Sequence, residues 1–226
     1  MINLDQQIKL FKDVGDILDE KIECLVIGGS AMMFYGAKVA TKDIDLVFMN
    51  KNNLEKVKKI LEKSGYEEKN LNIFKRYTFV KKDLYKPIWM QDKDTRIDLF
   101  LKKVICFWIS ENILNRIKEV HEFNNLIIKI ISPEDIILLK CATEREKDRM
   151  DALELINKFN IDWDIIIKES IEQTKLGESI FPVFLFDFLY ELKEDFKADI
   201  PKDVINKIRN ISEKLMIEKF KKDKKG

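Results

Sequence analysis

The chain has few of the residues that many enzymes use for proton transfer and metal binding. Of its 226 residues, one is histidine and three are cysteine. A single histidine, His121, argues against a Ser-His-Asp triad, a histidine-rich metal site and histidine general base catalysis, and we expect it in a polar surface turn. The cysteines, Cys24, Cys106 and Cys141, are odd in number and widely separated. They predict buried reduced thiols and not a disulfide framework or a zinc site.

The chain also lacks an excess of either charge and any long apolar run. Its formal net charge is +1, with 36% charged and 46% hydrophobic residues. This composition is typical of a soluble globular protein with no overall affinity for a polyanion. No apolar run approaches membrane-spanning length, and the first residues lack the layout of a signal peptide. We therefore expect a cytoplasmic protein with no membrane contact.

What the chain does contain is one stretch rich in motifs, residues 27–47, which reads IGGSAMMFYGAKVATKDIDLV. The apolar run at residues 24–27 predicts a buried strand that leads into it. Gly28, Gly29 and Ser30 then predict a tight turn whose backbone N–H groups can face an anion. A short helix is expected after this turn, and the dipole at its N-terminus would also favour an anion.

Two carboxylates follow on the next predicted strand. Asp43 and Asp45 alternate with aliphatic residues, so period two places both on one face. Adjacent carboxylates repel each other, and a divalent cation is the usual compensating charge. Mg²⁺ is commonly held by one or two carboxylates together with substrate phosphates. An anion-binding turn beside such a pair indicates phosphoryl or nucleotidyl transfer.

These motifs resemble the nucleotidyltransferase superfamily, which has the fold of DNA polymerase β. Its hallmark is a Gly-Gly/Ser turn, a helical spacer, an Asp-x-Asp strand and a third acid on a neighbouring strand. The matching residues here are Gly28, Gly29, Ser30, Asp43, Asp45 and Asp98. The resemblance implies an NTP such as ATP held at the turn, and Mg²⁺, as two ions with Mn²⁺ as the alternative, held by the three acids. Asp98 would also help to deprotonate the acceptor.

A plainer interpretation stays open for the same residues. Single acids are common on exposed strand faces, so the three aspartates would then be solvated charges and the glycines would only turn the chain.

The remainder of the first part predicts a mixed α/β sheet. Helices are expected over residues 4–19, 54–63 and 111–120, strands over 76–80, 95–101 and 126–131, and a polar loop over 82–94. Four cations at the predicted strand 76–80 would lie near the proposed site and steer a triphosphate or an RNA backbone, or they would be solvated charges. They are Lys75, Arg76, Lys81 and Lys82.

From Ser132 onward the chain reads as helical. Ser132 and Pro133 are a typical helix start, with acids in the first turn. The sequence therefore predicts an α/β nucleotidyltransferase domain over residues 1–131 and an all-helical domain over residues 132–226. The aromatic run at 181–190 is interpreted as a buried helix or a dimer contact, with base stacking as the alternative.

The helical part contains a second candidate site. Lys140 is followed by Asp148 and Asp151, which are three residues apart and so share a helix face. This pattern resembles the AbiEii/MenA-like toxins and related uncharacterised bacterial and archaeal nucleotidyltransferases. The resemblance implies that Lys140 contacts the triphosphate and takes part in catalysis, and that Asp148 or Asp151 positions the nucleotide, the lysine or the acceptor. The alternative is a charged helix face held together by ion pairs between neighbouring turns.

Together these features predict a Mg²⁺-dependent nucleotidyltransferase that moves a nucleoside monophosphate from an NTP to a hydroxyl acceptor. The acceptor is left open among tRNA, a protein, an antibiotic and a small metabolite, and a homodimer or an antitoxin partner is left open as well. The alternative is a non-catalytic nucleotide-binding or partner-binding protein of a toxin–antitoxin type system.

Overall fold

The computed structural model describes residues 1–69, 87–143, 145–177 and 180–223. The chain forms two compact units, residues 1–132 and 133–226, which we call the sheet unit and the helical unit. The prediction of a mixed α/β part followed by helices is confirmed. Across the described ranges, no helix is both long and apolar enough to cross a bilayer.

A mixed sheet of seven strands, in the order β10-β11-β2-β4-β7-β6-β5, forms the centre of the sheet unit. The pairs β11–β2 and β4–β7 are parallel and the others are antiparallel. Two short two-stranded pairs, β1–β3 and β8–β9, stand beside it. The strands are β1 (Ile2–Asn3), β2 (Ile22–Ile27), β3 (Ala40–Thr41), β4 (Asp43–Phe48), β5 (Glu67–Glu68), β6 (Ile88–Gln91), β7 (Arg96–Leu101), β8 (Lys103–Val104), β9 (Phe107–Trp108), β10 (Glu119–Phe123) and β11 (Leu126–Ile130).

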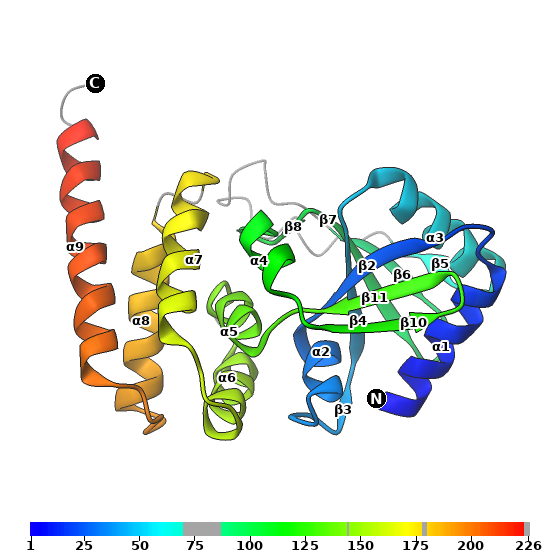
Figure 1. Cartoon of the computed structure of the whole chain (residues 1–226), viewed down its shortest axis with the longest axis horizontal. Coiled ribbons are helices and arrows are strands. Elements are labelled where there is room, and N and C mark those ends of the chain that lie inside the picture. Colours follow the sequence, from blue (N-terminus) through cyan, green and yellow to red (C-terminus); the bar gives the residue numbers. More distant parts are fainter. Residues whose placement is uncertain (70–86, 144, 178–179, 224–226) are drawn as a thin grey trace. The chain divides into compact units, whose positions relative to one another are not determined.

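Two amphipathic helices cover the sheet. Helices α1 (Leu4–Ile17) and α3 (Lys51–Lys63) contact each other and both pack on the strands, as Figure 1 shows. The first begins with a capping box, in which Asn3 and Gln6 each accept a hydrogen bond from the other's backbone. Short helices α2 (Gly28–Phe34) and α4 (Glu111–Arg116) complete the unit.

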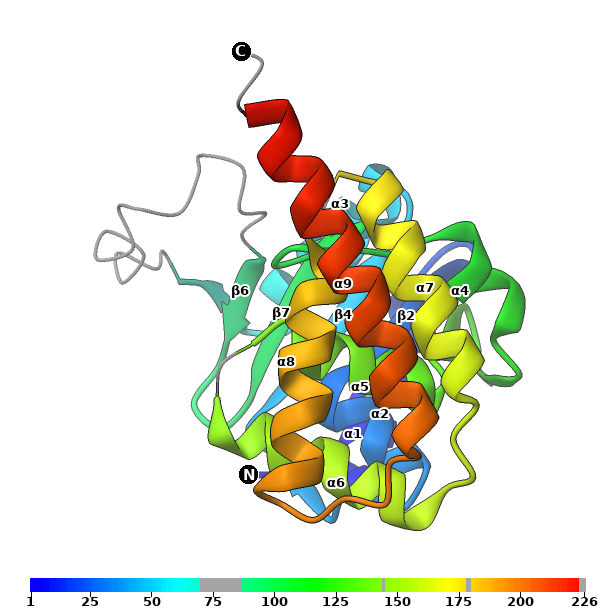
Figure 2. The same ribbon diagram turned by 90° about the vertical axis from the view of Figure 1, so that its left-hand side faces the viewer.

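The helical unit consists of α5 (Pro133–Cys141), α6 (Glu146–Lys158), α7 (Trp163–Lys175), α8 (Phe181–Glu194) and α9 (Lys202–Asp223). Helices α8 and α9 lie side by side (Figure 2). The buried Ser212 hydroxyl joins them by donating to the Pro182 carbonyl at 2.9 Å. Phe181 and Phe188 are buried while Phe184 and Tyr190 are exposed, so the aromatic run is only partly the core helix that was predicted.

Two predicted elements in the sheet unit are wrong. Strand β6 lies inside the predicted loop at 82–94. The helix predicted over 111–120 ends at Arg116, and Glu119–Phe123 is strand β10. This strand pairs antiparallel with β11 over its full length, from Glu119 opposite Ile130 to Phe123 opposite Leu126. The pairing outweighs the apolar spacing that favoured a longer helix.

The remaining predictions concern the rare residues. His121 lies in β10 and not in a turn; its Nε2 is 2.9 Å from Glu119 Oε1. The three cysteines form no disulfide, with Cys24 and Cys141 buried and Cys106 half-buried. The strand predicted over 76–80 and the cations Lys75, Arg76, Lys81 and Lys82 lie outside the described residues.

Candidate functional site

The three predicted acids come together on one face of two neighbouring strands. Strands β4 and β7 run parallel, with Asp45 opposite Asp98 and Asp43 opposite Arg96. Residues opposite each other in a parallel pair project from the same face, so all four side chains share it. Asp98 is buried, with 5% of its surface exposed, and Asp43 and Asp45 are half-buried.

Arg96 lies among these carboxylates. Its Nε donates to Asp98 Oδ1 at 2.7 Å and its Nη2 to Asp98 Oδ2 at 2.5 Å. Its Nη1 is 3.8 Å from Asp43 Oδ2. The guanidinium carbon also stands 4.0 Å from the centre of the Trp89 ring. A bidentate, stacked arginine of this kind is held strongly in place.

The charges around Arg96 favour its protonated form. Burial alone would lower the pKa of Arg96, but the hydrogen bonds and charge of Asp98, followed by the charges of Asp43 and Asp45, outweigh burial and raise this pKa. All three carboxylates therefore stabilise the protonated guanidinium.

The predicted turn at Gly28 and Gly29 is the first turn of helix α2 in the structure, and this helix packs against β4. Gly28 has φ +61°, and a Cβ at this position would stand 2.7 Å from Asp45 Oδ2. At Gly29 a Cβ would stand 2.7 Å from Thr41 Oγ1. Gly28 therefore allows the backbone to approach the Asp45 carboxylate, and Gly29 the Thr41 side chain, more closely than any other residue would permit.

Ser30 is fully buried behind this turn. Its hydroxyl donates to the main-chain carbonyl of Asp43 at 3.3 Å. In this structure Ser30 thus links α2 to β4 and helps to position Asp43.

The chemistry of this donor set fits a divalent cation. Three carboxylates on adjoining strands supply the hard oxygen ligands that Mg²⁺ prefers, and the backbone at Gly28 lies close against the Asp45 carboxylate. In the present arrangement, no three His, Cys, Asp or Glu side chains among the described residues converge closely enough to hold a metal ion. Arg96 is bonded to Asp98 and stands 3.8 Å from Asp43, so in this arrangement a guanidinium occupies the space between the two carboxylates.

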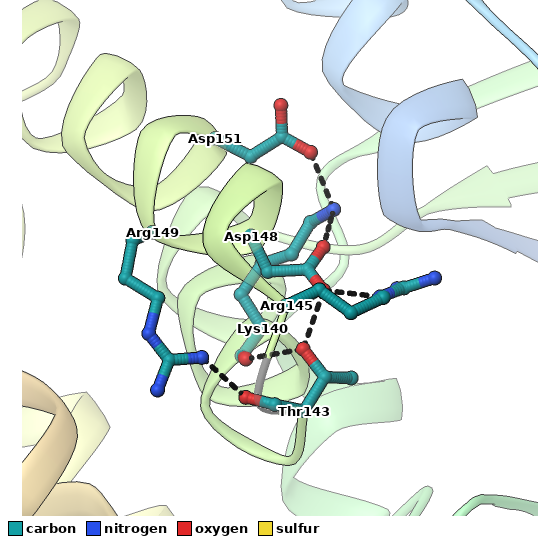
Figure 3. A network of polar contacts seen from close by, with 6 residues as sticks. All are labelled: Lys140, Thr143, Arg145, Asp148, Arg149 and Asp151. Carbon is teal, nitrogen blue, oxygen red and sulfur yellow. Dashed lines mark hydrogen bonds and ion pairs between the residues drawn. The ribbon is translucent and has the colours of Figure 1, made fainter.

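The second predicted site is a buried ionic network in the helical unit (Figure 3). Lys140 Nζ donates to Asp148 Oδ1 at 2.7 Å and to Asp151 Oδ2 at 2.5 Å. Lys140 is 7% exposed and Asp148 is fully buried. Thr143 and Arg145 also donate to Asp148 Oδ2, the latter at 2.6 Å.

Burial alone would raise the pKa of Asp148, but the charge and hydrogen bond of Lys140, with the hydrogen bonds of Thr143 and Arg145, lower it from 3.8 to about 2. Asp148 is therefore a permanent anion at neutral pH. A lysine ammonium has three N–H donors, and Asp148 and Asp151 accept two of them.

The structure also contains a cavity at the other end of the same strands. It has a volume of about 590 Å³ and none of the predicted site residues line it. Its lining residues are Met49, Asn50, Lys51, Leu101, Lys102 and Trp108.

Sequence reasoning missed Arg96 and Trp89. Arg96 had an available signal, because period two along the strand places it on the face of Asp98. Trp89 had none, because its strand fell within the predicted loop.

Comparison with known families agrees with this geometry. Residues 7–182 match the family described as "Nucleotidyl transferase of unknown function (DUF2204)". This region includes both the carboxylate face and the Lys140 network. None of the curated proteins compared with the chain matches it. With most of its length matched, the chain belongs to this family of nucleotidyltransferases of unknown function.

Proposed function

We propose that the protein is a Mg²⁺-dependent enzyme that transfers a nucleoside monophosphate from an NTP to a hydroxyl acceptor. The observation that supports this most is the pairing of Asp45 with Asp98 on adjoining strands, with Asp43 on the same face and the Gly28 turn against Asp45. Asp43, Asp45 and Asp98 would hold the metal, with Mn²⁺ as an alternative ion. Bound there, the metal would stabilise charge on the attacking and leaving oxygens.

The chain's own groups would perform the remaining steps. The backbone at Gly28 and Gly29 would hold the triphosphate, with Ser30 fixing the turn to β4. The Asp98 carboxylate would accept the proton of the acceptor hydroxyl. The acceptor oxygen then bonds to the α-phosphorus while the bond to pyrophosphate breaks, so pyrophosphate leaves with the bonding electrons.

We also propose a nucleotide-binding role for Lys140, Asp148 and Asp151, by resemblance to the AbiEii/MenA-like toxins. The donor capacity of a lysine ammonium supports this role, because its three N–H groups allow a bond to a phosphate beside the two ion pairs. Asp148 and Asp151 would then hold the ammonium in position. A tRNA or a protein as acceptor, and an antitoxin as partner, belong to the same proposal.

One observation favours a second function. Arg96 already neutralises part of the carboxylate face. This is the arrangement expected of a protein that keeps the nucleotidyltransferase fold but does not catalyse transfer. Such a protein would bind a nucleotide or a partner and transfer nothing.

Calorimetric titration of ATP, GTP, CTP and UTP, with Mg²⁺ and then with EDTA, tests the proposal. We expect one NTP to bind only with Mg²⁺. We also expect Asp45→Asn to weaken binding or transfer by more than the ~10–100-fold loss typical of an outer-shell partner. Asp13→Asn, the same change on the exposed face of α1, should leave both unchanged. If no NTP binds with Mg²⁺, the enzyme assignment fails.

A further inference from the structure

Arg96 makes more contacts with the candidate site than any role so far explains. Its guanidinium bonds both oxygens of Asp98, at 2.7 and 2.5 Å, and stands 3.8 Å from Asp43. Its other side lies on the Trp89 ring at 4.0 Å. The side chain is 32% exposed, so it is neither a core residue nor a solvated surface charge.

The carboxylate face requires a positive charge in order to be stable. Asp43, Asp45 and Asp98 project together from β4 and β7, and three anions at this spacing repel one another strongly. Arg96 relieves this repulsion from inside the protein. The same attraction between the carboxylates and the guanidinium raises the pKa of Arg96.

A divalent ion held by Asp98 would compete with Arg96 directly. Both oxygens of Asp98 are already acceptors for Arg96. Two cations drawn to one buried carboxylate also repel each other at this distance. The backbone positions of the three acids do not oppose metal binding, because Asp45 and Asp98 are already opposite each other. The side chain of Arg96 opposes metal binding, because it occupies both oxygens of Asp98.

The Trp89 ring is in contact with the Arg96 guanidinium and can therefore report its position. The two residues lie on neighbouring antiparallel strands, with Trp89 opposite Asp98 and Arg96 opposite Gln91. The Trp89 Nε1 is buried and has no hydrogen-bond partner among the described residues. The ring is therefore held by packing and by the guanidinium stack, and indole fluorescence responds to a cation leaving its face.

We propose that Arg96 is the resting counter-ion of the carboxylate face, and that a divalent cation binds by displacing it from Asp98 and from Trp89. This inference rests on the proposed metal site. Arg96 is then a positioning residue that sets the metal affinity of the nucleotide-free protein. Metal binding is also coupled to the contact between Arg96 and the Trp89 ring.

Manganese titration of the full-length protein, followed by the electron paramagnetic resonance signal of free Mn²⁺, tests the affinity. We expect Arg96→Met to bind Mn²⁺ on the order of tenfold more tightly than the wild type, because the guanidinium no longer has to leave Asp98. Arg96→Lys, which keeps the charge but loses the two-bonded geometry, should fall between them. Lys129→Met is the matched control: Lys129 is 31% exposed, pairs with Glu23 and lies in the same sheet. It should bind as the wild type does.

Fluorescence tests the displacement without removing Arg96. In a Trp108→Phe/Trp163→Phe variant, Trp89 is the single tryptophan. Titration with Mg²⁺ should change its emission along the same curve as metal binding, and the change should be lost when Arg96 is also methionine. The titration of the variant that keeps Arg96 stands by itself even if Arg96→Met folds poorly.

The outcomes separate the inference from the proposed function. If the wild type binds metal through Asp45, but Arg96→Met binds no more tightly or Trp89 emission stays constant, the counter-ion role is wrong and the metal site remains. If neither the wild type nor the Arg96 variants bind Mg²⁺ or Mn²⁺ in a way that Asp45→Asn abolishes, both are wrong.

Discussion

At the scale of single residues, position 28 has the clearest requirement for glycine. Its φ of +61° lies in the left-handed region, and a Cβ would stand 2.7 Å from Asp45 Oδ2. Gly28→Ala should therefore lose about 1–2 kcal/mol for the backbone alone, and more because the methyl group pushes the Asp45 carboxylate aside. Urea unfolding measures the stability, and titration with Mg²⁺ and NTP measures the site.

Gly65 provides the matched control for Gly28→Ala. It has φ +92°, but nothing lies within 4 Å of the point where a Cβ would stand. Gly65→Ala should lose the backbone part of the stability and keep ligand binding. Equal ligand binding by both variants would contradict the role of Gly28 in placing Asp45.

The residue scale also shows what a sequence pattern can and cannot specify. Strand periodicity was enough to predict that Asp43 and Asp45 share a face, and the resemblance to the nucleotidyltransferase superfamily added Asp98 to their site. It could not predict that Asp45 and Asp98 are opposite each other, because the register of two strands about 50 residues apart depends on tertiary packing. Nor could it show that the Ser30 hydroxyl faces the Asp43 carbonyl.

At the scale of elements, the long periodic helices were predicted well, whereas the two short strands β6 and β10 were not. Helices α1 and α3 have apolar stripes and end signals that agree with their burial. Strand β6 has only four residues, follows Pro87 and does not alternate cleanly. Strand β10 contains charged residues, so its pairing with β11 decides its structure and its own sequence does not.

The contact between α5 and α6 gives a prediction about an element pair. Lys140→Met would leave Asp148 and Asp151 buried without their shared cation. Removing one partner of a buried pair typically costs about 3–5 kcal/mol. Lys207→Met is the control, because Lys207 and Asp164 form an exposed pair in the same unit, and exposed pairs contribute little to stability. Urea unfolding at pH 7 compares them, and a similar loss in both variants would show that burial of the Lys140 network adds little.

The same network predicts a pH dependence. The pKa of Asp148 is lowered from 3.8 to about 2 in the folded protein. A carboxylate with a depressed folded pKa stabilises the fold above its unfolded pKa, and this stabilisation is lost as the pH falls from about 4 to about 2. In Lys140→Met the chief cause of the lowered pKa is gone, so stability should fall less steeply with acid. Unfolding midpoints at pH 5, 4 and 3 measure the two slopes, and equal slopes would contradict the assignment.

At the scale of the whole molecule, the predicted nucleotide-binding residues are divided between two units. The carboxylate face and glycine turn belong to residues 1–132, and Lys140, Asp148 and Asp151 to residues 133–226. The family match spans both, from residue 7 to residue 182. Sequence alone placed the change from sheet to helices near Ser132, because Ser132 and Pro133 start a helix directly after a buried strand.

This division allows the nucleotide-binding role of the helical unit to be tested. A ligand at a free concentration of 100 times its Kd raises the free energy of unfolding of the unit that binds it by about 2.7 kcal/mol. Trp108 lies in the sheet unit and Trp163 in the helical unit, so variants that keep only one of them report the unfolding of one unit. If Lys140 donates to the triphosphate, Mg²⁺ and NTP should raise the urea midpoint of both reporters, and Asp45→Asn should abolish both shifts. A shift of Trp108 alone would confine nucleotide binding to the sheet unit and leave Lys140, Asp148 and Asp151 as a network that stabilises the helices.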